Sequence, residues 1–183
     1  MGVLNTWYSN NLASQADKLT SGTGFCGDRE MTSGYSWSAT SNGITVNDSF
    51  FYSTYERLGI SKKPILECIT IADTFTTRNA KIGNEALQYP VGLITADEVA
   101  MAGGRNGANN RGYYLYTNQS YWTMSPFGMN AVTNAAVVFF IDSSGHLNTS
   151  SVSNINGIRP VINLRADVTL SGTGTASDPY VVS

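Results

Sequence analysis

The amino-acid sequence predicts an α+β domain, with helices in the first half of the chain and short antiparallel strands in the second. Apolar residues recur at helical spacing in three segments before residue 105. After residue 113, β-branched and aromatic runs alternate with turn residues. Helices followed by strands form the α+β pattern, and 183 residues suffice for one core but are few for two. We therefore expect a single domain over residues 1–183.

The first predicted helix covers residues 3–19. Leu4, Tyr8, Leu12 and Ala16 follow one another at intervals of four, so they fall on one face of a helix. Glycines follow this segment, as they commonly do where a helix ends.

A second, shorter helix is expected over about residues 48–58. Either Asn47 or Asp48 can cap its N-terminus with a side-chain oxygen, and Gly59 marks its end. Three apolar side chains would share one face of this helix: Phe51, Tyr55 and Leu58.

A third helix is expected to start at Thr95 and to end at Gly103 and Gly104. Thr95 and Glu98 have the spacing of a capping box, in which each side chain binds a backbone N–H at the start of the helix. Asp97 and Glu98 could also form a catalytic acid pair. Carboxylates in the first turn commonly stabilise the positive end of a helix, and we favour that interpretation.

Strand-like runs begin at Tyr113. A turn over residues 142–145 would join one strand to a returning strand that begins at His146. Pro160 lies within a later run, which predicts an edge strand or a bulge because proline has no backbone N–H. The runs cover residues 113–116, 121–124, 136–141, 158–164, 168–170 and 180–182.

Charged residues are scarce. They make up 13% of the chain, against roughly a quarter in a typical soluble domain, while aromatic residues make up 11%. Disordered chains combine high net charge with few aromatics, so this composition excludes disorder. A net charge of -2 argues against nucleic-acid binding, and no apolar run reaches the roughly 20 residues of a membrane span. We expect a loop-rich domain without nucleic-acid partners or membrane insertion.

Cys26 and Cys68 are the only cysteines, and His146 is the only histidine. A structural zinc site needs about four such ligands, so we expect no metal and no cofactor, with calcium left open. The cysteines can form a disulfide, as in an exported protein, or remain two separate buried thiols. We favour the disulfide, because an irregular segment with little apolar periodicity gains most from a crosslink.

Catalytic constellations are sparse in the sequence. The aspartates are scattered singly among turns, where they commonly stabilise loops, and no two carboxylates indicate the pair that glycoside hydrolysis needs. A serine triad needs a histidine base, and His146 follows a hairpin turn without an evident aspartate to orient it. We therefore expect that the protein is not an enzyme.

Residues 105–134 have the composition of a recognition surface. Tyr, Trp, Asn, Ser and Gly predominate there, and such mixtures bind ligands through rigid rings and adaptable amides. The alternative is that the rings fill a small core, which we favour for Trp122, and Arg159 is interpreted as a paired structural residue. Turns expected at residues 117–120 and 126–130 would expose the candidate ligand-binding residues: Asn118, Gln119, Tyr121, Phe127, Met129 and Asn130.

An ordered series of short motifs runs through nearly the whole chain: WYSNNL, FCGDR, KKPILEC, YPVGLITADEVAMAGG, YWTMSP, GIRPVINL and GTGTASDPYVV. In this series the sequence resembles C-terminal domains of exported proteins from gut Firmicutes and their phages. Those domains are similar to the C-type lectin fold, which also includes sulfatase-modifying enzymes and the variable proteins of diversity-generating retroelements. The resemblance implies a C-type-lectin-like fold with two main helices, short antiparallel strands and long irregular loops. It also implies that Cys26 pairs with Cys68.

Two departures limit what the resemblance implies. The fold usually begins with a strand that pairs with the C-terminal one, whereas this chain starts almost directly in its predicted helix. The upstream strand would then be left out or supplied by another chain, and an unpaired terminal strand can recruit a partner. The sequence also lacks the Glu-Pro-Asn, Gln-Pro-Asp and Trp-Asn-Asp motifs of calcium-dependent lectins, so the fold alone does not imply sugar binding.

We expect a non-enzymatic ligand-binding domain of a bacterial or phage surface protein, located outside the cell or on a cell or virion surface, and part of a larger parent protein. Its loops near residues 105–134 and 142–157 would contact a protein receptor or a glycan. Asparagine-rich loops also fit the adenine-directed codon variation of retroelement-diversified proteins. The alternative is a structural module that joins its neighbours through an open terminal strand edge.

Overall fold

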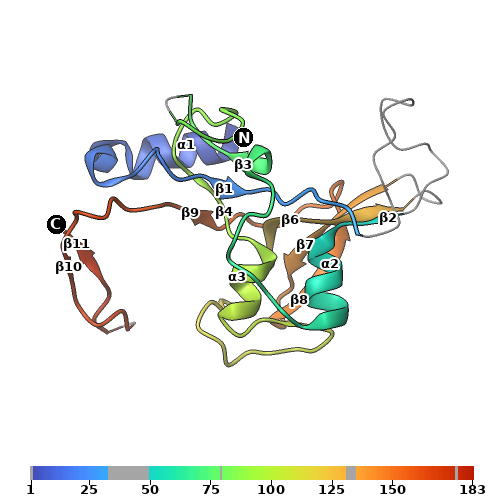
Figure 1. The fold of residues 1–183 in the computed structure, drawn as a ribbon. Coiled ribbons are helices and arrows are strands. Elements are labelled where there is room, and N and C mark those ends of the chain that lie inside the picture. The colour runs from blue at the N-terminus through green and yellow to red at the C-terminus, as the bar shows by residue number, and fades with distance from the viewer. Residues whose placement is uncertain (1, 33–49, 79, 131–134, 176) are drawn as a thin grey trace.

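A five-stranded sheet forms the centre of the molecule (Figure 1). The computed structural model describes residues 2–32, 50–78, 80–130, 135–175 and 177–183. The strand order is β2-β6-β7-β8-β5, and neighbouring strands are antiparallel except β8 and β5. This sheet, together with several helices, confirms the α+β prediction. The five strands are β2 (Phe50–Phe51), β5 (Arg105–Asn106), β6 (Tyr121–Asn130), β7 (Ala135–Ile141) and β8 (His146–Ser151).

The hairpin between β7 and β8 forms as the sequence predicts. The pleat of β7 turns Phe139 and Ile141 inward, where they are 0% and 1% exposed. In the predicted turn over residues 142–145, Gly145 has a φ of 77°, which glycine adopts without strain. Asp142 Oδ1 accepts hydrogen bonds from two backbone N–H groups of this hairpin.

Strand β6 is longer than expected. The sequence predicts a strand over residues 121–124 and a turn over residues 126–130, but β6 continues through both segments, so the predicted turn is wrong. The register against β7 shifts on either side of Pro126. A proline that lacks an N–H for the ladder is accommodated by such an irregularity.

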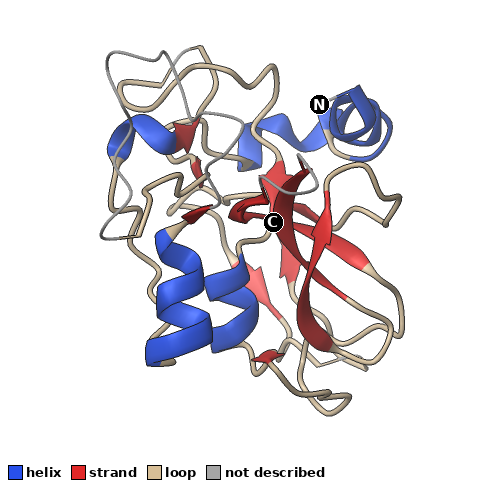
Figure 2. Ribbon diagram, turned by 90° about the vertical axis from the view of Figure 1, so that its right-hand side faces the viewer, coloured by secondary structure: helices blue, strands red, loops and turns tan. Residues whose placement is uncertain are grey.

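Helical segments lie against this sheet (Figure 2). The helix α2 (Ser53–Tyr55) continues into a π-helical segment, η2 (Glu56–Ser61), and α3 (Ala96–Met101) lies beside them. Between helices and sheet, the main core contains Leu58, Ile94, Ala96, Val99, Tyr113, Tyr121, Phe139, Ile141 and Leu147.

The second predicted helix begins later than expected. Phe51 pairs with Gly128 across β2 and β6, so the backbone at Phe51 is a strand. The helix therefore starts at Ser53, without a side-chain cap. The predicted caps, Asn47 and Asp48, lie outside the described residues. Sheet pairing has overridden the helical periodicity of this segment.

The capping box at the start of α3 is confirmed. Thr95 Oγ1 accepts a hydrogen bond from the backbone N–H of Glu98 at 3.1 Å, and the carboxylate of Glu98 accepts one from the N–H of Thr95 at 2.7 Å. Glu98 therefore stabilises the helix start, as the sequence predicts. The neighbouring carboxylate of Asp97 instead pairs with Arg57.

The first predicted helix is broken at Leu12. The helix α1 (Gly2–Asn11) is followed by the 3₁₀ segment η1 (Ala13–Lys18), and Leu12 between them has a φ of -130°. Ala16 is exposed, so only α1 keeps the predicted apolar face. A second core cluster at this end of the molecule contains Leu4, Tyr8, Leu19 and Val91.

A disulfide joins Cys26 to Cys68. The favoured pairing is thus confirmed, and two separate thiols are excluded. The strand β1 (Phe25–Cys26), which carries the first cysteine, pairs with β3 (Thr74–Phe75), which follows the 3₁₀ segment η3 (Ile71–Asp73). The bond fastens the irregular segment 62–70, which we call the strap, to β1.

Besides β1 and β3, two further pairs of short strands lie outside the central sheet: β4 (Gly92–Leu93) with β9 (Pro160–Val161), and β10 (Leu170–Ser171) with β11 (Val181–Val182). The strand predicted over residues 158–164 is therefore reduced to β9. The strand predicted over residues 113–116 is wrong, because this segment turns and sends Tyr113 into the core, where it is 7% exposed.

Candidate functional site

Two loops that are far apart in the sequence enclose an open groove of about 560 Å³. Residues 117–121 and residues 155–159 form its walls. Backbone hydrogen bonds hold the walls together: the N–H of Trp122 donates to the carbonyl of Gly157 at 3.0 Å, and the N–H of Gly157 donates to the carbonyl of Ser120 at 3.1 Å. The groove thus combines parts of both loop regions in which the sequence predicts ligand contacts.

Tyr121 and Arg159 form the deep part of the groove. Tyr121 is only 3% exposed, and the guanidinium carbon of Arg159 lies 5.2 Å from the centroid of its ring, a cation–π distance. Arg159 Nη1 also donates to the carbonyl oxygen of Leu115. Arg159 thus contacts a ring and a backbone carbonyl, forms no ion pair with a carboxylate of the described residues, and also lines the groove.

A second buried tyrosine, Tyr113, contacts Tyr121 in the main core. The hydroxyl oxygens of Tyr113 and Tyr121 lie 3.4 Å apart. Burial, together with the hydrogen bond to Tyr121, raises the pKa of the Tyr113 hydroxyl far above its usual range. The Tyr113 hydroxyl therefore stays neutral.

Neutral side chains line the rim of the groove. Asn118 precedes the lining residue Gln119 but does not itself line the groove: its backbone lies in the left-handed region, with a φ of 58°, and its Oδ1 accepts a hydrogen bond from the hydroxyl of Tyr116 at 3.1 Å. Gln119 is exposed. Ile155, on the opposite wall, is 97% exposed. The rim therefore offers an amide group on one side and an aliphatic surface on the other.

The six predicted ligand-binding residues do not form one surface. Gln119 lies at the rim of the groove, whereas Asn118 is exposed but is not among the residues that line it. Tyr121 lies beneath it, so the expectation that this ring is exposed is wrong. Because β6 replaces the expected turn, the other three lie along that strand: Phe127, Met129 and Asn130. Whether any of the six binds a ligand stays a prediction.

Phe127 belongs to an aromatic cluster between helix and sheet. The centroid of its ring lies 5.2 Å from that of Phe51, 5.0 Å from that of Tyr55 and 5.3 Å from that of Phe139. Such edge-to-face contacts stabilise the packing of α2 on β6. Met129 is half-buried opposite Phe50 and Ala136 in the sheet, and only the backbone of Asn130 is described.

His146 is oriented by an aspartate that the sequence did not reveal. Its Nδ1 lies 3.7 Å from Asp142 Oδ2, and its Nε2 accepts a hydrogen bond from the N–H of Gly107 at 2.9 Å. Burial raises the pKa of Asp142, but hydrogen bonds from Ser144 and from backbone N–H groups outweigh it and lower the pKa overall. Because Nε2 already binds a backbone donor, this pair lacks the free nitrogen of a general base.

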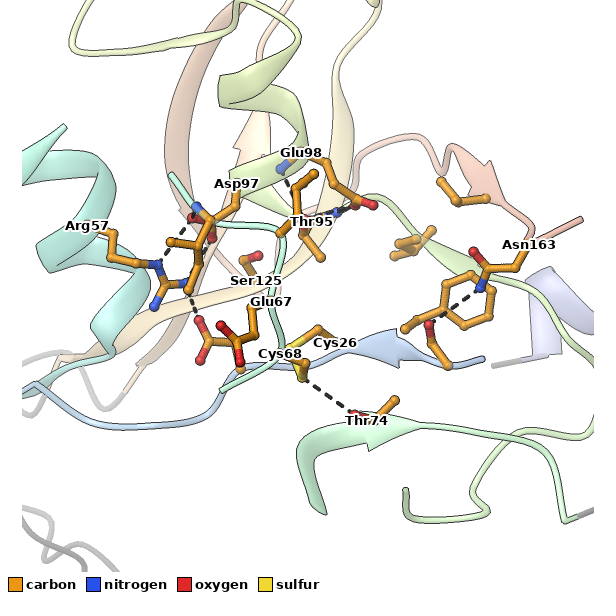
Figure 3. A pocket seen from close by; sticks show the side chains of 17 residues that line it. Cys26, Arg57, Glu67, Cys68, Thr74, Thr95, Asp97, Glu98, Ser125 and Asn163 are labelled. Atoms are coloured by element: carbon orange, nitrogen blue, oxygen red, sulfur yellow. Dashed lines mark hydrogen bonds and ion pairs between the residues drawn. A yellow bond between two sulfur atoms is a disulfide. The ribbon is translucent and has the colours of Figure 1, made fainter. Parts of the chain in front are cut away.

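A buried ionic cluster lies beside a small cavity of about 140 Å³ next to the disulfide (Figure 3). Arg57 of η2 pairs with the carboxylates of Asp28 and Asp97, at 2.9 Å from Nη2 in the latter case. The three side chains are 12%, 7% and 6% exposed. Thr54 donates its hydroxyl to Asp28, and the N–H of Ile65 donates to Asp97. The cluster therefore connects η2, α3 and the strap.

Arg57 supplies the positive charge of this cluster, which its two carboxylates share. Burial lowers the pKa of Arg57, but hydrogen bonds to Asp97 and Asp28 outweigh it and raise the pKa overall. Within the described part of the chain, Asp28 Oδ1 and Arg57 Nη1 have no hydrogen-bond partner. Because Asp28 and Asp97 share the guanidinium of Arg57, buried ion pairs join the segments that carry these three residues. In the sequence, Asp28 and Asp97 lie in unrelated segments, and no local pattern connects them.

The described ranges contain no group of three or more His, Cys, Asp and Glu side chains placed to hold a metal ion. No helix within them is both long enough and apolar enough to cross a membrane. Comparisons of the chain with protein-family models, curated proteins and solved structures find no match.

Proposed function

We propose that the chain is a ligand-binding domain of an extracellular surface protein, which recognises a protein receptor or a glycan through the groove between residues 117–121 and 155–159. The observation that carries this proposal is the groove itself, an open concavity of about 560 Å³ with exposed amide and aliphatic side chains at its rim. Ligand sites are typically concavities of about 300–1,000 Å³ in which a few polar groups fix the orientation of the ligand.

Recognition would depend mainly on neutral contacts. The amides of Gln119 and Asn156, which line the groove, offer donors and acceptors that suit sugar hydroxyls or a peptide backbone, and Ile155 offers apolar area. Arg159 is the one cation among the residues that line the groove, and it suits a carboxylate or carbonyl oxygen. The proposal is for binding without catalysis, because His146 Nε2 already accepts a backbone hydrogen bond and the two carboxylates beside Arg57 form ion pairs with it.

The proposal includes a C-type-lectin-like fold and a place on a bacterial or phage surface. A sheet flanked by helices, with much of the chain in loops, is compatible with that fold. The Cys26–Cys68 disulfide is compatible with an extracellular location. An asparagine at the rim of the groove also fits a retroelement-diversified protein, in which such codons vary.

A binding screen tests the groove. The labelled domain is applied to a glycan array and to intact gut bacteria, and we expect retention on a subset of them. Gln119→Ala and Ile155→Ala should each weaken that binding about tenfold, equivalent to about 1.4 kcal/mol, as contacts inside an interface do.

The matched controls are Gln15→Ala and Ile71→Ala, which alter exposed residues of the same types that do not line the groove. These variants should bind as the unaltered domain does. Equal binding by all four variants, or no retention of the unaltered domain, would count against the groove.

The C-terminal hairpin favours a second candidate function, assembly with neighbouring chains. Among the described strands, β10 and β11 pair only with each other. Three large side chains of this hairpin are exposed: Leu170 by 48%, Tyr180 by 60% and Val181 by 58%. A lone two-stranded sheet with exposed apolar side chains has edges to which a further strand can add. In this alternative, the chain is a structural module of a surface protein.

Light scattering distinguishes assembly from binding by a single copy. If the hairpin joins neighbours, the domain should form oligomers as its concentration rises, and Val181→Lys should abolish them because a charge blocks strand addition. Val152→Lys, at a position that is 55% exposed elsewhere on the surface, should leave the oligomers intact. A monomer at every concentration rules out assembly through copies of this chain.

A further inference from the structure

A second cleft, of about 320 Å³, lies between η2, the end of α3 and the start of β8. Leu58, Ala100 and Leu147 provide an apolar lining, and Lys62 and Arg105 lie among the residues around it. Figure 1 shows the helix labelled α2 and the helix α3 side by side, with β8 next to them. This cleft shares no lining residue with the groove of the proposed function, so an inference about it stands independently of that function.

The charges around this cleft are all positive. Lys62 and Arg105 are its charged lining residues, and no carboxylate is among them. Neither cation forms an ion pair with a carboxylate of the described residues. The whole chain carries a net charge of -2, whereas the lining of this cleft carries two positive charges and no negative one. Such a cleft attracts an anion.

The backbone places Lys62 at an unfavourable position. The segment η2 runs past Gly59, where the sequence predicts the helix to end, and its C-cap is Lys62 with φ 56° and ψ 37°. Glycine is the residue that normally occupies this left-handed C-cap, because a side chain there is disfavoured. The positive charge of a lysine here can offset this conformational cost in two ways. It can interact with the negative end of the helix, or it can bind an anionic ligand.

The apolar lining of the cleft favours a ligand that has an apolar part beside its charged group. Leu58 and Leu147 are 3% and 0% exposed, so the cleft reaches the main core. The side-chain amide of Asn106, also at the cleft, donates to the backbone carbonyl of Leu147 at 3.2 Å and holds β5 in place. A volume of about 320 Å³ is at the small end of ligand sites.

We propose that this cleft binds a small amphipathic carboxylate, whose head group lies between Lys62 and Arg105 and whose apolar body covers Leu58, Ala100 and Leu147. Arginine binds a carboxylate with two parallel hydrogen bonds, and lysine adds a point charge. The ligand is therefore a short fatty acid or a comparable apolar acid.

Titration with hexanoate, followed by backbone amide NMR shifts, tests this site. We expect shifts in residues 58–64 and 104–108, and 1-hexanol, which has the same body without the charge, should bind at least tenfold more weakly. Lys62→Gln and Arg105→Gln should each weaken hexanoate binding about tenfold, whereas Lys63→Gln, which alters a neighbouring lysine outside the cleft, should have no effect. Added salt should weaken the binding of hexanoate but not that of hexanol.

A further variant separates a ligand contact from a structural role. Lys62→Gly removes the cation and relieves the left-handed backbone, so hexanoate binding should weaken about tenfold while the melting temperature stays equal or rises. The proposal is overturned by any one of three results: no hexanoate binding, equal binding of hexanoate and hexanol, or an equal loss in Lys62→Gln and Lys63→Gln.

Discussion

Replacement of Arg57 by leucine is expected to lower the free energy of unfolding by about 3–5 kcal/mol. Asp28 and Asp97 would keep their buried positions, at 7% and 6% exposed, but lose the guanidinium with which both form ion pairs. A buried charge without a partner costs far more than the intact pair contributes. Urea unfolding of the variant and of the unaltered domain measures the difference.

The control for this result is an exposed ion pair of the same type. Arg165 pairs with Asp167 at 2.6 Å, with side chains that are 50% and 65% exposed. Arg165→Leu should leave the unfolding midpoint unchanged, because solvent and salt screen such pairs. If Arg57→Leu were as stable as Arg165→Leu, the cluster would not be the clamp that connects η2, α3 and the strap.

Loss of the disulfide is the other large expected effect. The cysteines are separated by 42 positions in the chain. In the chain-entropy model, a crosslink over a loop of that length lowers the entropy of the unfolded chain and so raises the free energy of unfolding by about 4 kcal/mol. The double variant Cys26→Ser, Cys68→Ser should lose about that much stability. Denaturant unfolding of the variant, compared with the oxidised domain, measures it.

Reduced domain of unaltered sequence provides the matched control, because it lacks the bond but keeps both sulfur atoms. It should unfold at the same denaturant concentration as the double variant. If mass spectrometry gives the untreated domain the same mass as the reduced domain, with no loss of hydrogens, the bond itself is contradicted. If the oxidised and reduced domains are equally stable, the stabilising role of the bond is contradicted.

Features that depend on neighbouring residues could be predicted from the sequence. The capping box of Thr95 and Glu98 and the turn ending at Gly145 each need only a few adjacent residues, and both form as predicted. Phe51 and Tyr113 lie in segments whose local pattern was misleading. Phe51 joins β6 instead of a helix, and Tyr113 fills the core from a turn, because pairing and burial outweigh weak local preferences.

The groove could be predicted only in part. Gln119 follows from the composition of its loop, but the position of the opposite wall depends on the pairing of Tyr121 with Gly157, which no local pattern encodes. The same limit applies to the cluster of Asp28, Arg57 and Asp97, whose three residues come from three segments of the chain. Sites assembled from distant segments become visible only when the fold brings them together.

The most direct test of the groove is hydrogen–deuterium exchange of the domain with the glycan or cell-surface protein that the screen retains. If the groove is the ligand site, backbone amides in residues 117–121 and 155–159 should exchange more slowly in the complex. The strap and the hairpin of β10 and β11 should exchange as they do in the free domain. Slower exchange confined to the strap, to that hairpin or to the cleft beside Lys62 would contradict the proposed function.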